Sequence, residues 1–100
     1  MNISGASSMS YNIIFTKSYT KRAARFIKKH PDLTGQYEKT LKLLRLNPKH
    51  PSLELHSLKG KLTGLHSASV NISYRITIEI LIRSKTIIPV YIGTHDEVYR

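Results

Sequence analysis

The sequence predicts an α+β fold in which a two-helix hairpin packs on one face of a mostly antiparallel, four-stranded sheet. Three observations predict this fold. Apolar residues recur at helical spacing through two consecutive stretches, residues 74–80 alternate with a period of two within a β-rich last third, and polar or proline-containing turns separate the segments. The expected order of elements is β-α-α-β-β-β.

The first half of the chain predicts one strand and two helices. Residues 11–16 are aromatic and β-branched, which favours a strand. In residues 17–30 apolar side chains recur every three or four positions and Lys or Arg occupies most others, as on an amphipathic helix. Pro31 ends that helix, and Asp32 is a candidate N-cap for a second helix that runs to about Leu46.

The second half predicts an irregular connection at residues 50–61 and then three strands, at residues 65–70, 72–83 and 86–92. In the middle strand, alternation places Ile76 and Ile78 beneath the helices. It places Arg75 and Thr77 on the opposite, open face. Pro89 cannot donate a ladder hydrogen bond, so we expect it beside a bulge or at an unpaired edge.

Residues 1–9 are rich in Ser, Gly and Ala and predict a flexible N-terminal tail, which leaves residues 10–100 as one domain. No apolar run is long enough to span a membrane or to form a signal peptide. The chain has no cysteine, which excludes disulfides and thiolate metal sites. We therefore expect a cytoplasmic protein.

The charge points to a polyanionic partner. Sixteen Lys and Arg residues oppose six Asp and Glu residues, for a net charge of +10. Twelve of the basic residues lie between Lys17 and Lys61, where only three acidic residues oppose them. Such an excess repels itself unless a polyanion or an acidic protein neutralises it. RNA is the partner that we expect, and a generally basic, solvated surface is the alternative.

The residue types favour chemistry without a metal or cofactor. The five histidines are never spaced as closely as metal ligands in one motif, and no cluster of carboxylates accompanies them. No Gly-rich phosphate loop occurs. Metal-free cleavage of RNA needs a base for the 2′-OH, an acid for the leaving 5′-oxygen and a fixed positive charge. Histidine and arginine suit these roles. The second half supplies both types: His56, His66, Arg75 and His95, with Lys59 and Lys61 as RNA-binding candidates and Tyr99 near the end.

Three segments carry a resemblance to a known family. Residues 55–61 (LHSLKGK) contain His-x-Leu-x-Gly, residues 93–99 (GTHDEVY) begin with Gly-Thr-His, and Tyr74-Arg75-Ile76 lies between them. In this order they resemble the RelE/ParE toxin superfamily, in its YafQ-like mRNA interferase branch. The resemblance extends over roughly residues 11–100 and includes the order of elements.

The resemblance implies a RelE-like fold for residues 10–100 and the function of a type II toxin–antitoxin toxin. It implies a metal-independent endoribonuclease that cleaves mRNA on the ribosome by attack of the 2′-OH. The implied partners are a cognate antitoxin, mRNA and the ribosome, with no membrane, metal or cofactor.

The resemblance also implies roles for site residues. His56 and His95 match positions that act in proton transfer or phosphate contact. Arg75 matches an arginine that contacts the scissile phosphate. Tyr99 matches an aromatic residue that holds a base or orients the site. His66 falls where relatives carry Lys or Arg, so it could bind phosphate or transfer a proton.

Alternatives stay open. Ser69 and Ser73 stand where YafQ-like toxins carry a further His and an Asp, and serine is a poor general acid or base. Arg75 could instead form a surface ion pair with Glu79, and Tyr99 could simply anchor the chain end. The rival functions are a ParE-like gyrase poison without nuclease chemistry and a catalytically degenerate RNA-binding domain. The candidate histidines favour the nuclease, because a poison needs no proton-transfer groups.

Overall fold

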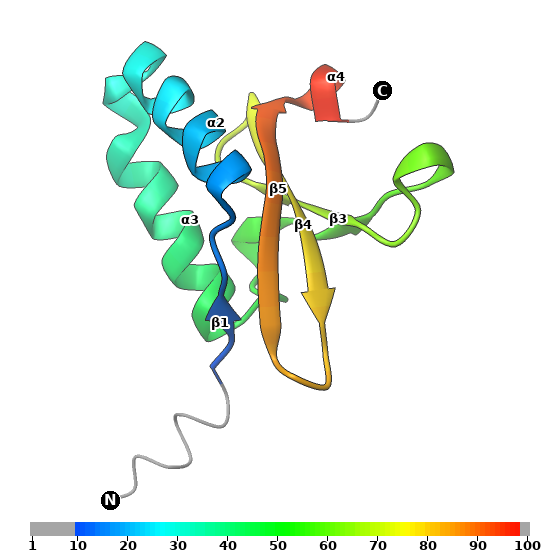
Figure 1. Cartoon of the computed structure of the whole chain (residues 1–100). Coiled ribbons are helices and arrows are strands. Elements are labelled where there is room, and N and C mark those ends of the chain that lie inside the picture. The colour runs from blue at the N-terminus through cyan, green and yellow to red at the C-terminus, as the bar shows by residue number, and fades with distance from the viewer. Residues whose placement is uncertain (1–9, 99–100) are drawn as a thin grey trace, which may run out of the picture.

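The computed structural model describes residues 10–98. The main elements follow the predicted order (Figure 1): β1 (Asn12–Ile13), α2 (Lys17–Lys29), α3 (Thr34–Leu46), β3 (His66–Ser69), β4 (Tyr74–Leu81) and β5 (Thr86–Thr94). Shorter elements join them: the 3-10 turns η1 (Pro31–Leu33), η2 (Pro51–Leu53) and η3 (Gly60–Leu62), the strand β2 (His56–Ser57) and the helix α4 (His95–Val98). No helix within residues 10–98 has the length and apolar character needed to cross a membrane.

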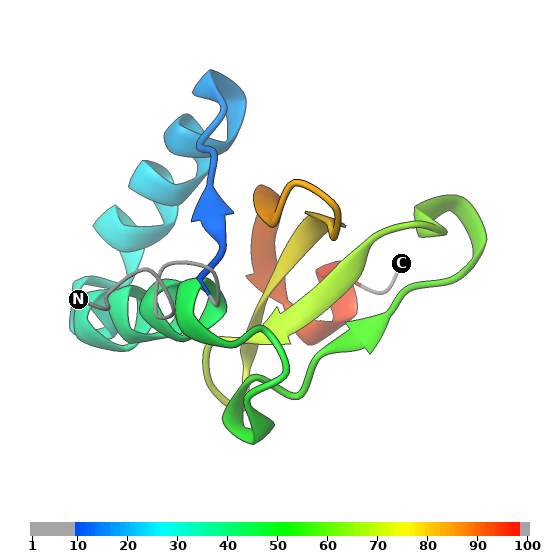
Figure 2. The ribbon, with the colours of Figure 1, turned by 90° about the horizontal axis from the view of Figure 1, so that it is seen from below.

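The strands form one sheet in the order β1-β5-β4-β3-β2, with β1 parallel to β5 and the other pairs antiparallel. Helices α2 and α3 lie on one side of it (Figures 1 and 2). The predicted α+β class, with its helical hairpin on a mostly antiparallel sheet, is confirmed. The sheet has one strand more than predicted, because the two-residue β2 pairs with β3 inside the connection expected to be irregular.

The core lies between the hairpin and the sheet. Ile76 and Ile78 are completely buried in it, which confirms the predicted register of β4. Between the helices, the hydroxyl groups of Tyr19 and Tyr37 are 2.8 Å apart in a buried hydrogen bond. Burial raises the pKa of both phenols, so both keep their protons and the hydrogen bond persists. Other core residues are Phe26, Leu44, Leu53, Val70, Ile87 and Ile92.

Three local predictions have different outcomes. Pro89 pairs with Ile78 at a register shift, which confirms the expected bulge. Asp32 is not a helix N-cap, because it lies in η1 and α3 begins after that turn. The first strand is shorter than predicted. It ends at Ile13, and Thr16 instead caps α2, where its hydroxyl accepts a hydrogen bond from the Tyr19 N–H at 3.1 Å.

Helix α4 was not predicted, and it lies on the side of the sheet opposite α2 and α3 (Figures 1 and 2). A capping box begins it: the Glu97 carboxylate accepts from the Thr94 N–H at 2.7 Å, and the Thr94 hydroxyl accepts from the Glu97 N–H at 3.2 Å. Val98 is buried, and α4 contacts both β4 and β5. The face of the sheet that we expected to be open is therefore partly covered.

Candidate functional site

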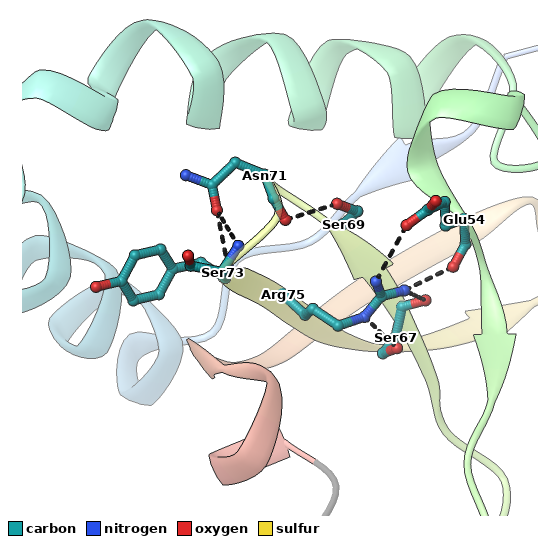
Figure 3. Close-up of polar contacts among 7 residues, drawn as sticks. Glu54, Ser67, Ser69, Asn71, Ser73 and Arg75 are labelled. Atoms are coloured by element: carbon teal, nitrogen blue, oxygen red, sulfur yellow. Dashed lines mark hydrogen bonds and ion pairs between the residues drawn. The ribbon is translucent and has the colours of Figure 1, made fainter.

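Arg75 on β4 is the centre of a buried polar cluster (Figure 3). Its Nε donates to the Ser67 hydroxyl at 2.8 Å, and its Nη2 donates to the Glu54 carbonyl at 2.6 Å and the Ser67 carbonyl at 3.3 Å. Nη1 lies 3.7 Å from a carboxylate oxygen of Glu54. Among residues 10–98, the ion pair of Arg75 is therefore with Glu54 across the fold and not with Glu79 along the strand.

The prediction that Arg75 and Thr77 face solvent was wrong. Their exposed fractions are 6% and 3%. Alternation along β4 does place them on the face opposite Ile76 and Ile78, as predicted. That face is covered by α4 and by the segment that carries Glu54, and the period of a strand says nothing about such long-range cover.

His56 lies on β2, directly opposite Ser67 in the ladder with β3. Directly opposed residues of an antiparallel pair point to the same face. Since the Ser67 hydroxyl accepts the hydrogen bond from Arg75, one residue connects the two predicted site residues. The His56 side chain is exposed and lines an open cavity of about 380 Å³ together with Ser57, Leu58, Lys59 and Leu62.

His95 is the first residue of α4, and its position is set by the end of the β4–β5 ladder. Arg75 pairs with Gly93 in that ladder, and the His95 N–H donates to the Ser73 carbonyl at 3.2 Å. These backbone pairings bring His95 to the end of the strand that carries Arg75. The His95 side chain is 63% exposed, and its Nδ1 lies 3.7 Å from an Asp96 carboxylate oxygen. It is accessible to a substrate.

Gly93 has a steric reason to be glycine. A Cβ atom there would lie 2.8 Å from the Glu97 carboxylate oxygen that caps α4 and 2.8 Å from the Tyr91 ring. Gly93→Ala is therefore expected to displace the cap and lower the free energy of unfolding by about 1–2 kcal/mol. Urea unfolding and amide exchange at Glu97 would measure this.

Gly35→Ala is the matched control. Gly35 lies in α3, and a Cβ atom there would meet nothing within 4 Å. Alanine is the better helix former, so this change is expected to raise the free energy of unfolding by up to about 1 kcal/mol. If the two substitutions changed stability in the same direction, the steric explanation for Gly93 would fail.

The structure does not bring His66 to this cluster. His66 alternates along β3 with Ser67 and shares a face with the core residue Ala68. It lines a largely apolar cavity of about 480 Å³ with residues such as Tyr11, Leu55 and Ile80. Its Nδ1 is buried and finds no hydrogen-bond partner within residues 10–98.

The two lysine candidates lie in the segment that follows β2 and contains η3. Lys59 and Lys61 are exposed, and Lys59 lines the same cavity as His56. Tyr99 lies outside the described residues. The structure thus places Arg75 and His56 on either side of Ser67, and His95 at the end of the β4–β5 ladder. Lys59 lies beside His56.

Ser69 and Ser73 belong to a turn. The Ser69 hydroxyl donates to the Asn71 carbonyl at 2.9 Å, and the Asn71 side-chain oxygen accepts from the Ser73 and Tyr74 N–H groups at 2.9 and 2.8 Å (Figure 3). These contacts stabilise the β3–β4 connection. The sequence analysis did not identify Asn71 as a turn residue, although asparagine commonly forms such turns. The turn gives Ser69 a structural role.

Helix α2 adds a strongly basic surface beside the strand end. Its six basic residues meet no acidic residue within the helix: Lys17, Lys21, Arg22, Arg25, Lys28 and Lys29. The Arg22 guanidinium lies 5.1 Å from the centre of the Tyr91 ring, at a cavity of about 410 Å³ that reaches Thr94 and Glu97. Across residues 10–98 no three His, Asp or Glu side chains lie together as metal ligands would.

No protein-family model matches the chain, and no curated protein sequence matches it. Solved structures do match. YafQ from E. coli superposes with a TM-score of 0.72 at 17% identity, over 90% of this chain and 99% of that chain. The E. coli DinJ-YafQ toxin-antitoxin complex superposes with a TM-score of 0.68 at 19% identity, over 91% of this chain and 99% of that chain. The Staphylococcus aureus YoeB-YefM complex superposes with a TM-score of 0.65 at 20% identity, over 85% of this chain and 97% of that chain.

These matches span nearly the whole of each matched chain, and their TM-scores show a shared fold. The resemblance that the three sequence segments suggested is thereby confirmed at the level of the fold. The chain has the same fold as the YafQ and YoeB toxins in these structures.

Proposed function

We propose that this protein is the toxin of a type II toxin–antitoxin system and an endoribonuclease that cleaves mRNA on the ribosome, in the cytoplasm. The observation that carries the proposal is the placement of His56 and His95 around the strand of Arg75. Two proton-transfer groups and one permanent positive charge are what cleavage at a ribose 2′-OH requires. Similarity to structures of toxin–antitoxin complexes supports an antitoxin partner.

The proposed reaction needs no metal. One histidine takes the proton of the 2′-OH, and the 2′-oxygen bonds to phosphorus. The bond from phosphorus to the 5′-oxygen then breaks, and the other histidine gives that oxygen a proton. Arg75 stabilises the dianionic phosphorane between these steps. Tyr99, by resemblance, holds a base, and Lys59 and Lys61 bind the RNA backbone.

The charge distribution supports the proposed partners. A chain of 100 residues has little surface with which to hold mRNA alone, and the basic face of α2 suits docking on ribosomal RNA. The net charge of +10 also makes an acidic antitoxin an effective partner, since charge complementarity speeds association.

Two observations favour a second candidate, an RNA-binding domain that has lost catalysis. Arg75 is buried, and Ser69 and Ser73 form a turn where relatives have acid–base residues. A ParE-like gyrase poison is a third candidate. It requires no nuclease site, so the arrangement of His56, Arg75 and His95 would have no role in it.

Cleavage of mRNA by the purified protein on translating ribosomes separates these candidates. We expect products with 2′,3′-cyclic phosphate and 5′-hydroxyl ends, because the 2′-oxygen is the nucleophile. One 2′-deoxy substitution at the mapped cut site should abolish cleavage there and leave other sites unaffected. The test for metal independence uses free RNA, because EDTA would dismantle ribosomes. Any cleavage of free RNA should continue in EDTA.

The alternatives give other outcomes. Cleavage that survives the 2′-deoxy substitution would exclude the proposed mechanism. Ribosome binding without new mRNA ends would support the degenerate domain, and inhibition of gyrase without RNA cleavage would support the poison.

A further inference from the structure

Glu54 contacts Arg75 in two different ways (Figure 3). Its main-chain carbonyl accepts from Nη2 at 2.6 Å, and its carboxylate lies 3.7 Å from Nη1. The Glu54 backbone has φ 44° and ψ 54°, which is the left-handed region. This conformation is unfavourable for a residue with a Cβ atom. It follows the turn η2 and turns the carbonyl toward the guanidinium.

The two contacts differ in how easily they can be replaced. The Nε and Nη2 edge of Arg75 is held by the Ser67 hydroxyl, the Ser67 carbonyl and the Glu54 carbonyl, and the first two bonds are buried. The Glu54 carboxylate belongs to a side chain that is 66% exposed. An exposed carboxylate loses little when it leaves an ion pair, because water solvates it well. Another anion can therefore replace the Glu54 carboxylate at Nη1 while the hydrogen bonds of Nε and Nη2 stay in place.

We propose that Glu54 is the positioning residue of Arg75, whose carbonyl fixes the guanidinium and whose carboxylate occupies the place of an RNA phosphate until RNA displaces it. A guanidinium binds carboxylate and phosphate oxygens with the same donors, so the exchange needs no rearrangement of the fork. The left-handed backbone supports this role, since strained residues concentrate where a site has to be held in one geometry. The inference rests on the proposed RNA cleavage and adds a competing anion to it.

Glu54→Gln removes the competing charge and keeps the carbonyl and the side-chain size. The probe is a 2′-O-methyl RNA oligonucleotide, which the proposed reaction cannot cleave anywhere. We expect binding about threefold tighter in fluorescence anisotropy. On ribosomes we expect KM to fall by the same factor while kcat stays within about twofold, because uniform binding changes KM alone.

Glu79→Gln is the matched control. Glu79 lies on β4 on the same face as Arg75, and within residues 10–98 its carboxylate makes no ion pair with Arg75. It removes the same charge, so a smaller gain than that of Glu54→Gln is expected. In an Arg75→Lys background, which keeps the charge but loses the fork, the gain from Glu54→Gln should disappear.

A second variant protects the test against misfolding. Asparagine tolerates the left-handed region, so Glu54→Asn should keep or raise the melting temperature while giving the same tighter binding. Equal gains from Glu54 and Glu79 variants would overturn the inference and indicate general electrostatics. A kcat loss of tenfold or more with unchanged oligonucleotide binding would also overturn it and assign the carboxylate to the chemistry. Tighter oligonucleotide binding with no mRNA cleavage by any form would uphold Glu54 as competitor and refute the nuclease.

Discussion

Replacing His95 by Gln is expected to lower mRNA cleavage on ribosomes by on the order of 100-fold or more, because glutamine cannot transfer a proton near neutral pH. The folded state should be almost unaffected. The His95 side chain is 63% exposed, and its contact with the β4 strand end uses the backbone N–H. Single-turnover cleavage of mRNA on stalled ribosomes would measure the first effect, and thermal unfolding the second.

His50→Gln is the control for this change. His50 lies in the loop after α3, where its Nδ1 accepts from the Ser52 N–H at 3.2 Å, and a glutamine oxygen can also accept there. Cleavage by the His50 variant should equal that of the wild type. If His95→Gln retained full activity, the proton transfers would have to come from elsewhere and the proposed mechanism would be wrong.

Arg75→Ala is expected to impair both cleavage and folding. The rate should fall on the order of 100-fold, as for loss of a transition-state charge contact. The free energy of unfolding should also fall by about 3 kcal/mol, since buried acceptors on Ser67 and Glu54 lose their donor. An arginine on an open face would have given only the first effect. Urea unfolding and cleavage by the folded variant measure the two separately.

Arg75→Lys separates the two roles of this residue. Lysine keeps the charge but cannot reach Ser67 and Glu54 with a planar fork, so we expect intermediate stability and a strongly reduced cleavage rate. Thr40→Val is a useful stability reference, because Thr40 is 1% exposed and its hydroxyl donates to the Gln36 carbonyl one helical turn earlier. An Arg75→Ala protein as stable as the wild type would contradict the buried network.

Residue pattern was enough to predict the features that depend on nearby neighbours. The helical repeat located α2 and α3, and the alternation in β4 placed Ile76 and Ile78 in the core. The missing N–H of Pro89 predicted a bulge or an unpaired edge, and the structure has the bulge. The same alternation indicates the strand face of His66. It shares that face with Ala68, which is apolar and buried, while Ser67 and Ser69 lie on the other face.

Other features had weak or no local signal. The capping box of Thr94 and Glu97 was a usable sign of α4, but four residues are too few to show a helical period. The left-handed backbone of Glu54 has no sequence signature, because glutamate rarely adopts it without support from elsewhere in the fold.

The composition of the candidate site could be predicted from residue types and their order, while its geometry could not. His56, Arg75 and His95 come from three segments that local rules treat separately. Their arrangement depends on the β2–β3 and β4–β5 registers and on a hydrogen bond to Ser67. The burial of Arg75 depends further on Glu54, 21 positions earlier in the chain. Contacts at such separations form because the core aligns whole strands, and no periodicity within one strand encodes them.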